Sequence, residues 1–202
     1  RPRAHRRGGA ALRPENTIAA FDHGLALGAD GLELDVHLSR DGVVVVHHDD
    51  TLERTTNAHG PVSGRTADEL AQVDAGYRFT PDSRASTPLY PFRGQEIGVP
   101  RLRTVLERYP SARVIIELKT ADAELAHRTI DEVRAARALD RVILGSFHWR
   151  ALNAARRYEP RIPTGAASEE TRWALYRSRV RWPLGRTIYR EFQVPERSGT
   201  TL

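Results

Sequence analysis

Beyond Pro100 the chain alternates between helical and extended segments, and this order constrains the fold more than any other feature of the sequence. Strands that alternate with helices of this length form βα units around a parallel sheet. In parallel sheets, ligands bind at the carboxyl ends of the strands, so polar residues at those positions are the first candidates for a site. The predicted elements are helix 102–109, strand 114–118, helix 122–137, strand 142–147, helix 149–158 and a short strand at 163–166.

Residues 31–48 form a different kind of unit. Two extended segments, GLELDVHL and VVVVHH, are separated only by the turn SRDG, whereas a parallel crossover needs about a dozen residues or more. We therefore predict an antiparallel hairpin. A helix over residues 15–27, with apolar residues at helical spacing, precedes it and ends at Gly28.

The hairpin places acidic residues on one face. Glu33 and Asp35 are two positions apart on a strand, so both carboxylates point the same way. If the turn is centred on residues 40 and 41, His48 lies opposite Glu33 and shares its face, while His47 points the other way. A slip of one residue would exchange His48 for His47.

A third carboxylate is predicted at the same rim. Glu117 and Lys119 share a face at the carboxyl end of the strand VIIEL. Three converging carboxylates repel one another unless a divalent cation joins them, and an all-oxygen ligand set favours Mg²⁺ or Ca²⁺ over zinc. Histidines beside such a metal suit a general acid and a general base. The polar groups at strand ends are His5, Glu33, Asp35, His48, Glu117 and Lys119.

Residues 50–99 are the least regular part of the chain and are rich in Gly, Pro, Ser, Thr and Asp. One capped helix is predicted within them, because Thr66 and Glu69 form a capping-box pattern. We interpret this segment as an insertion within one domain that spans residues 1–202, not as a linker between two domains.

Composition limits the other classes of function. The chain has no cysteine, which excludes disulfides and thiolate chemistry, and no apolar run approaches the roughly 20 residues of a transmembrane helix.

The stretch 171–190 interleaves arginines with aromatic residues, so a non-catalytic module that binds a polyanion or a membrane is one alternative. The competing interpretation of this stretch is an ordinary barrel helix and loop. The whole chain is rich in arginine, since Lys119 is the only lysine among 31 basic residues. No nucleic-acid partner is expected.

A series of motifs resembles the glycerophosphodiester phosphodiesterases. AHR, PENT (Pro14 to Thr17), AAF, GADGLELDV and the run DGxxVVxHDxTLxRTT are similar to the first half of that family. VPRL, IIELK and GSF are similar to its later motifs. The similarity covers the chain to about residue 166.

The resemblance implies a TIM barrel with an insertion after the second strand. It also implies metal-dependent hydrolysis of glycerophosphodiesters, within glycerol and lipid metabolism, to glycerol 3-phosphate and an alcohol. The family usually has His-Arg-Gly where this chain has HRRG, which leaves open whether Arg6 or Arg7 contacts the phosphate. By position, the resemblance assigns catalysis to His5 and His48, phosphate binding to Arg6 and Lys119, and one Mg²⁺ or Ca²⁺ ion to Glu33, Asp35 and Glu117.

The chain is shorter than a whole barrel. A (β/α)₈ barrel typically needs about 250 residues, and we predict only about six strands, the last within residues 187–194. The last two βα units have no counterpart, and the chain begins with Arg1 and contains no methionine, so we expect a barrel cut at both ends. A missing leader would permit secretion, but we expect a cytoplasmic protein. The sequence leaves the oligomeric state and the alcohol headgroup open.

A second enzymatic interpretation keeps the same barrel. A phospholipase D of the sphingomyelinase type acts on intact phospholipids instead of glycerophosphodiesters. The residues quoted above do not separate the two substrate classes, and they do not assign which histidine is the acid.

Overall fold

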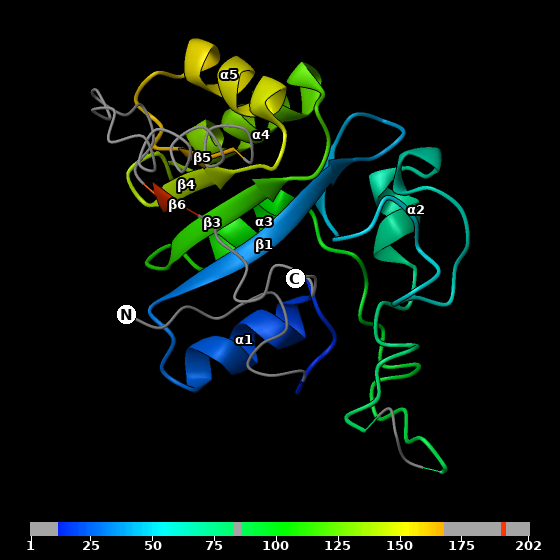
Figure 1. Cartoon of the computed structure of the whole chain (residues 1–202). Helices are drawn as coiled ribbons and strands as arrows, with labels where there is room; N and C mark the ends of the chain where they lie inside the picture. The colour runs from blue at the N-terminus through cyan, green and yellow to red at the C-terminus, as the bar shows by residue number, and fades with distance from the viewer. Residues whose placement is uncertain (1–11, 83–85, 168–190, 193–202) are drawn as a thin grey trace, which may run out of the picture.

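The computed structural model describes residues 12–82, 86–167 and 191–192. The main sheet has four strands in the order β2-β1-β3-β4 (Figure 1). β1, β3 and β4 are parallel and β2 is antiparallel to β1, which confirms both the predicted hairpin and the predicted parallel units. The strands are β1 (Gly31–Leu38), β2 (Val44–Val46), β3 (Arg113–Leu118) and β4 (Val142–Gly145).

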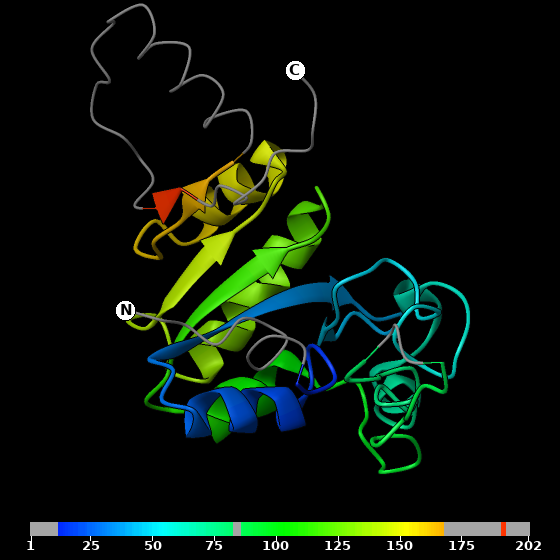
Figure 2. The same cartoon turned by 60° about the horizontal axis from the view of Figure 1, so that its bottom comes forward.

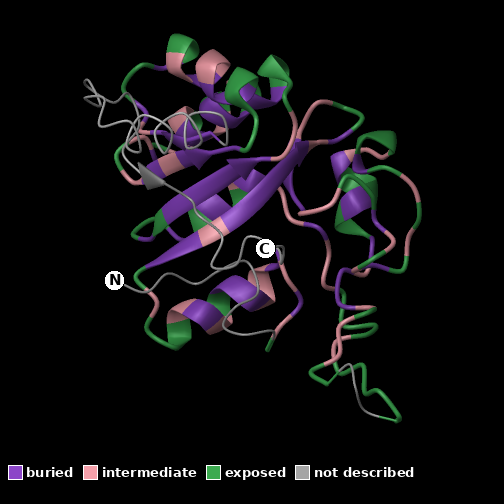
Figure 3. Cartoon of the chain, viewed as in Figure 1, coloured by how far each residue is buried: buried purple, intermediate pink, exposed green. Residues whose placement is uncertain are grey.

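Four helices contribute to the hydrophobic core of this sheet. Side-chain hydrogen bonds cap the first turn of two of these helices. The Thr17 side chain accepts a hydrogen bond from the Ala20 amide at the start of the helix over residues 18–26, and the Asp122 side chain accepts one from the Glu124 amide at the start of the helix over residues 123–135. Figure 3 shows the buried residues running along the strands and the inward sides of the helices. The helices are α1 (Ile18–Ala26), α3 (Leu102–Arg108), α4 (Ala123–Ala135) and α5 (Trp149–Tyr158).

The two faces of the sheet differ in chemistry because strand side chains alternate. Even-numbered residues of β1 and β3, such as Leu34 and Ile116, belong to the core formed with the helices. Odd-numbered residues point to the other face. In the register of the parallel pair, Asp35 lies beside Glu117, so this second face carries the acidic side chains.

The register of the hairpin differs from the prediction by one residue. Val36 pairs with Val46 and Leu38 with Val44, so the predicted pairing of Glu33 with His48 is wrong. The loop has three residues, because the Ser39 amide donates to the Val43 carbonyl, and its last residue, Gly42, has a φ of 74°. A three-residue hairpin loop that ends on a left-handed glycine is a common alternative to the two-residue turn that the prediction assumed.

Described residues of the segment 51–99 build a second, smaller hydrophobic cluster together with β2. The cluster is built on Leu52, Val62 and Leu70, with Val45 of β2 at its edge. Figures 1 and 2 both show this segment beside the sheet. It contains η1 (Val62–Gly64) and α2 (Ala67–Ala71), and the predicted capping box of α2 is present. Its interpretation as an insertion within a single domain remains a prediction.

Two short strands end the described part of the chain. β5 (Gly165–Ala166) pairs in parallel with β6 (Glu191–Phe192). β6 falls inside the predicted last strand, whose other residues lie outside the described ranges, as does the basic aromatic stretch 171–190. Among the described residues, no helix combines the length and the apolar character that crossing a bilayer requires.

Candidate active site

Three carboxylates converge on the acidic face of the sheet. Glu33, Asp35 and Glu117 each offer an oxygen atom, and these atoms all lie within 4.8 Å of one another. Asp35 is fully buried, Glu117 is 6% exposed and Glu33 is half-buried. The alternation of β1 and the parallel register of β1 and β3 produce this convergence, as the sequence pattern predicted. We call these three residues the acid cluster.

Lys119 is the basic partner of the acid cluster. Its Nζ lies 2.9 Å from Glu117 Oε1 and 3.5 Å from Asp35 Oδ1, and its side chain is only 15% exposed. Carboxylates this close repel one another, and a divalent cation bound between them would offset that repulsion.

The chemistry of the donor set fits a hard divalent cation. All three donors are carboxylate oxygens, the ligand type that Mg²⁺ and Ca²⁺ prefer, and none is a sulfur or an imidazole nitrogen, which zinc sites commonly use. The acid cluster can therefore bind a divalent metal ion.

Asn16 holds Asp35 in place, and the sequence analysis did not identify it. Its Nδ2 donates to Asp35 Oδ2 at 2.9 Å, and the Asp35 amide donates to Asn16 Oδ1 at 3.3 Å. Asn16 is 2% exposed and has a φ of 55°, a left-handed conformation that asparagine tolerates better than most residues. The motif PENT contains this residue, but a partner 19 positions away cannot be read from the motif.

Two of the histidines near this rim are tied to backbone carbonyls. His37 Nε2 lies 3.2 Å from the His48 carbonyl, and His47 Nε2 lies 3.1 Å from the Thr51 carbonyl. Both rings are buried, and burial is the main reason that the pKa of each is lowered. These two side chains therefore have structural partners.

His48 has a different environment. It follows β2 in a loop, its side chain is 28% exposed, and its Nδ1 lies 2.5 Å from Asp49 Oδ1. Burial by itself would raise the pKa of Asp49, but hydrogen bonds from Arg54 and His48 outweigh it and lower that pKa to about 2. A partly exposed imidazole with an ionised carboxylate on one nitrogen is suited to proton transfer through the other nitrogen.

The structure thus brings together four of the predicted site residues. Glu33, Asp35, Glu117 and Lys119 form one group. His48 lies on the loop after β2, and its own backbone carbonyl contacts the His37 ring. The predicted residues His5 and Arg6, and the alternative Arg7, lie outside the described residues.

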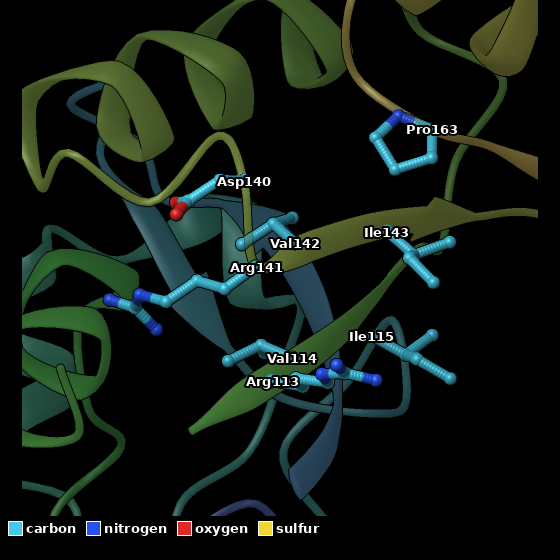
Figure 4. A pocket seen from close by; sticks show the side chains of 8 residues that line it. All are labelled: Arg113, Val114, Ile115, Asp140, Arg141, Val142, Ile143 and Pro163. Atoms are coloured by element: carbon cyan, nitrogen blue, oxygen red, sulfur yellow. The ribbon is translucent and has the colours of Figure 1, made fainter. Parts of the chain in front are cut away.

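A hollow between β3 and β4 lies away from this group. Figure 4 shows it at the first residues of the two strands, lined by Arg113, Ile115 and Ile143 among others. Glu117 and Gly145 are at the other ends of the same strands. Ligands of parallel sheets bind at carboxyl ends, so the acid cluster and not this hollow is the candidate active site.

Fold and site together define an α/β chain with three acidic residues on one face of two neighbouring parallel strands. Solved structures of TIM-barrel type share its architecture. A glycerophosphodiester phosphodiesterase from Agrobacterium tumefaciens C58 matches with a TM-score of 0.68 and 37% identity, over 80% of this chain and 64% of that one. An Oleispira antarctica phosphodiesterase, solved with the product sn-glycerol-3-phosphate, matches with a TM-score of 0.71 and 26% identity, over 90% and 72%.

Sequence comparison gives the same assignment. The model of the glycerophosphoryl diester phosphodiesterase family matches residues 5–200. A glycerophosphodiester phosphodiesterase from Caldanaerobacter subterraneus is 35% identical over 157 residues, which are 75% of this chain and 60% of that protein. The chain belongs to the glycerophosphoryl diester phosphodiesterase family, as its motifs predicted. It spans less than two thirds of the length of the Caldanaerobacter and Agrobacterium proteins.

Proposed function

We propose that the protein hydrolyses a glycerophosphodiester, with the help of one divalent cation, to glycerol 3-phosphate and an alcohol. The observation that carries the proposal is the acid cluster, formed by Glu33 and Asp35 of β1 with Glu117 near the carboxyl end of β3, in a chain of this family. The Oleispira phosphodiesterase, which was solved in complex with its product sn-glycerol-3-phosphate, supports this product.

In this proposal Glu33, Asp35 and Glu117 hold Mg²⁺ or Ca²⁺. The bound cation would supply positive charge that stabilises the phosphoryl oxygens as negative charge develops on them. Lys119 lies beside Glu117, so its ammonium group is placed to contact the same phosphate. Arg6 or Arg7 would provide a second phosphate contact from outside the described residues.

The two proton transfers belong to His48 and His5. One imidazole removes a proton from the nucleophile, which is either water or the neighbouring glycerol hydroxyl, and the other protonates the leaving alkoxide. Asp49 occupies Nδ1 of His48, so Nε2 is the nitrogen that exchanges a proton. General acid–base catalysis of this kind contributes roughly 10²–10⁴ in rate.

The fold in this proposal is an incomplete (β/α)₈ barrel. Residues 1–202 form one domain with about six strands, and residues 50–99 are an insertion. The separate hydrophobic cluster of residues 51–99 supports the insertion. A cytoplasmic location stays a prediction.

Product analysis tests this proposal directly. The purified chain is incubated with glycerophosphocholine and either Mg²⁺ or Ca²⁺, and phosphorus NMR follows the appearance of glycerol 3-phosphate. We expect hydrolysis that stops when a chelator removes the cation. Hydrolysis of a choline lysophospholipid in place of glycerophosphocholine would instead favour the phospholipase D of the sphingomyelinase type. No hydrolysis with either cation, or undiminished hydrolysis with chelator, would contradict the proposal.

A further inference from the structure

A continuous series of charged contacts ends on His48. Arg54 donates from Nε to Asp49 Oδ2 and from Nη2 to Glu15 Oε1. Asp49 in turn contacts His48 through its other oxygen, Oδ1, at 2.5 Å from Nδ1. The series therefore runs from Glu15 through Arg54 and Asp49 to the imidazole, and it joins segments that are 39 residues apart in sequence.

Arg54 is the central member of this series. Its guanidinium bridges two carboxylates, a geometry that its planar fork of donors provides and that a lysine ammonium does not. Glu15 is 10% exposed and Asp49 is 26% exposed, whereas Arg54 is 44% exposed. Both carboxylate partners of Arg54 are mostly buried. They therefore fix the orientation of its guanidinium, although the Arg54 side chain reaches solvent.

The ionisation of Asp49 determines which ring nitrogen of His48 carries the proton. An ionised carboxylate only accepts hydrogen bonds, so the nitrogen that faces Asp49 must carry a proton. In the neutral ring the lone pair is then on Nε2. Among the described residues, His37 Nε2 contacts the backbone carbonyl of His48, and Asp50 Oδ1 lies 3.8 Å from His37 Nδ1.

We propose that Arg54, anchored by Glu15, is a positioning residue that holds Asp49 against Nδ1 of His48 and thereby sets the tautomer and direction of the imidazole. The catalytic consequence rests on the proposed function, in which His48 transfers a proton. The orienting role itself depends only on the contacts of the folded chain.

The neighbouring residue extends the same argument to the metal side of the site. Asn16 follows Glu15 directly, and its side chain holds Asp35 of the acid cluster. Adjacent residues of one short segment therefore contact both halves of the site. This arrangement relates the position of His48 to that of the acid cluster through two neighbouring residues of one segment.

Substitution of Arg54 tests the proposal kinetically. We expect Arg54→Gln to lower kcat by roughly tenfold to hundredfold, the range typical of residues that orient a catalytic group, with unchanged KM and unchanged magnesium affinity. Arg54→Lys keeps the charge without the fork and should recover part of the loss. In an Asp49→Asn background, Arg54→Gln should add no further loss, because the two residues act as one unit.

Arg108→Gln is the matched control. Arg108 also pairs through Nε and Nη2 with one carboxylate, that of Asp22, and it joins α3 to α1 away from the acid cluster. Arg108 is 51% exposed, close to the 44% of Arg54, although its partner Asp22 is more exposed than Glu15 or Asp49. Its loss should leave kcat unchanged. An equal loss of kcat in the Arg54 and Arg108 variants would overturn the positioning role, as would full additivity with Asp49→Asn.

Nitrogen-15 NMR of the His48 ring gives a readout that does not need activity. We expect a proton on Nδ1 in the wild-type chain and a mixture of tautomers in Arg54→Gln. If the ring is unchanged by Arg54→Gln, the positioning role is wrong. If the wild-type chain hydrolyses no glycerophosphodiester, the proposed function fails, while the NMR result still decides the role of Arg54.

Discussion

The acid cluster and the His48 loop are held in place in different ways. Asp35 and Glu117 are neighbours in the ladder of two parallel strands, and their backbones are fixed by the hydrogen bonds of the sheet. His48 lies two residues beyond the end of β2, and side-chain contacts through Asp49 and Arg54 orient it. One half of the site is therefore positioned by regular backbone structure and the other by individual polar contacts.

This difference predicts how each half responds to mutation. A substitution in the acid cluster changes charge while many ladder hydrogen bonds keep the backbone in place. A substitution in the loop removes one of the few contacts that orient the imidazole. In the strands, we expect loss of function when a carboxylate charge of the acid cluster is removed. In the loop, we expect it when the orientation of the His48 imidazole is lost.

The largest effect is expected from the acid cluster. Asp35→Asn keeps the shape of the side chain but removes one of three charged ligands, so hydrolysis should fall by about 10³ or more, the equivalent of several kcal/mol of transition-state stabilisation. Added Mg²⁺ should no longer raise the melting temperature. Calorimetric titration and thermal unfolding measure both effects.

Asp131→Asn is the control for this substitution. Asp131 lies on the surface of α4, where it contacts Arg134 and Tyr158, and its loss should leave metal binding unchanged. Normal metal binding by the Asp35→Asn variant would contradict the proposed role of the acid cluster in holding the metal.

The loop half is tested by His48→Ala. We expect turnover to fall by roughly 10²–10³, within the range for loss of a general acid or base, with normal magnesium binding. His59→Ala removes an exposed histidine of the same region and should leave turnover intact. Near-normal turnover of His48→Ala would show that the histidine assignment is wrong.

Asn16 sharpens the comparison because it supports a strand residue from outside the sheet. Asn16→Gly removes the amide that orients Asp35 but tolerates the positive φ, and metal affinity should fall by roughly tenfold to hundredfold. Asn16→Ala should lose the same affinity and, in addition, about 1 kcal/mol of unfolding free energy from left-handed strain. Equal metal affinity in wild type and Asn16→Gly would show that the ladder alone is sufficient to position Asp35.

The smallest effect concerns Asp49 and pH. Its folded pKa of about 2 lies below the usual 3.8, so the contribution of Asp49 to stability is present above pH 3.8 and is lost as pH falls through about 2. With allowance for partial exposure this contribution is about 1 kcal/mol. Urea unfolding between pH 2 and 5 should show a shallower dependence for Asp49→Asn than for wild type. Identical slopes would mean that the Arg54–Asp49–His48 contacts do not stabilise the folded chain.

The sequence was most informative where periodicity controls geometry. Alternation along β1 predicted that Glu33 and Asp35 share a face, and the strand pattern before Glu117 placed a third acid at the same rim. Thr66 and Glu69 predicted their capping box, because both partners lie within one helical turn. These predictions required only local spacing, which strands and helices impose on any sequence.

Tertiary structure decided the features that depend on partners distant in sequence or on loop conformation. Gly42 adopts a left-handed φ, which makes the hairpin loop one residue longer than predicted. His48 therefore does not lie opposite Glu33, and the His47 amide donates to the Asp35 carbonyl. Asn16 reaches Asp35, and Arg54 reaches Glu15, only because the folded chain brings these segments together. By itself the sequence determined which acids share a face, since side-chain direction in a strand repeats every two residues. The contacts of Asn16 and Arg54 depend on how separate segments pack, and no short-range pattern encodes that packing.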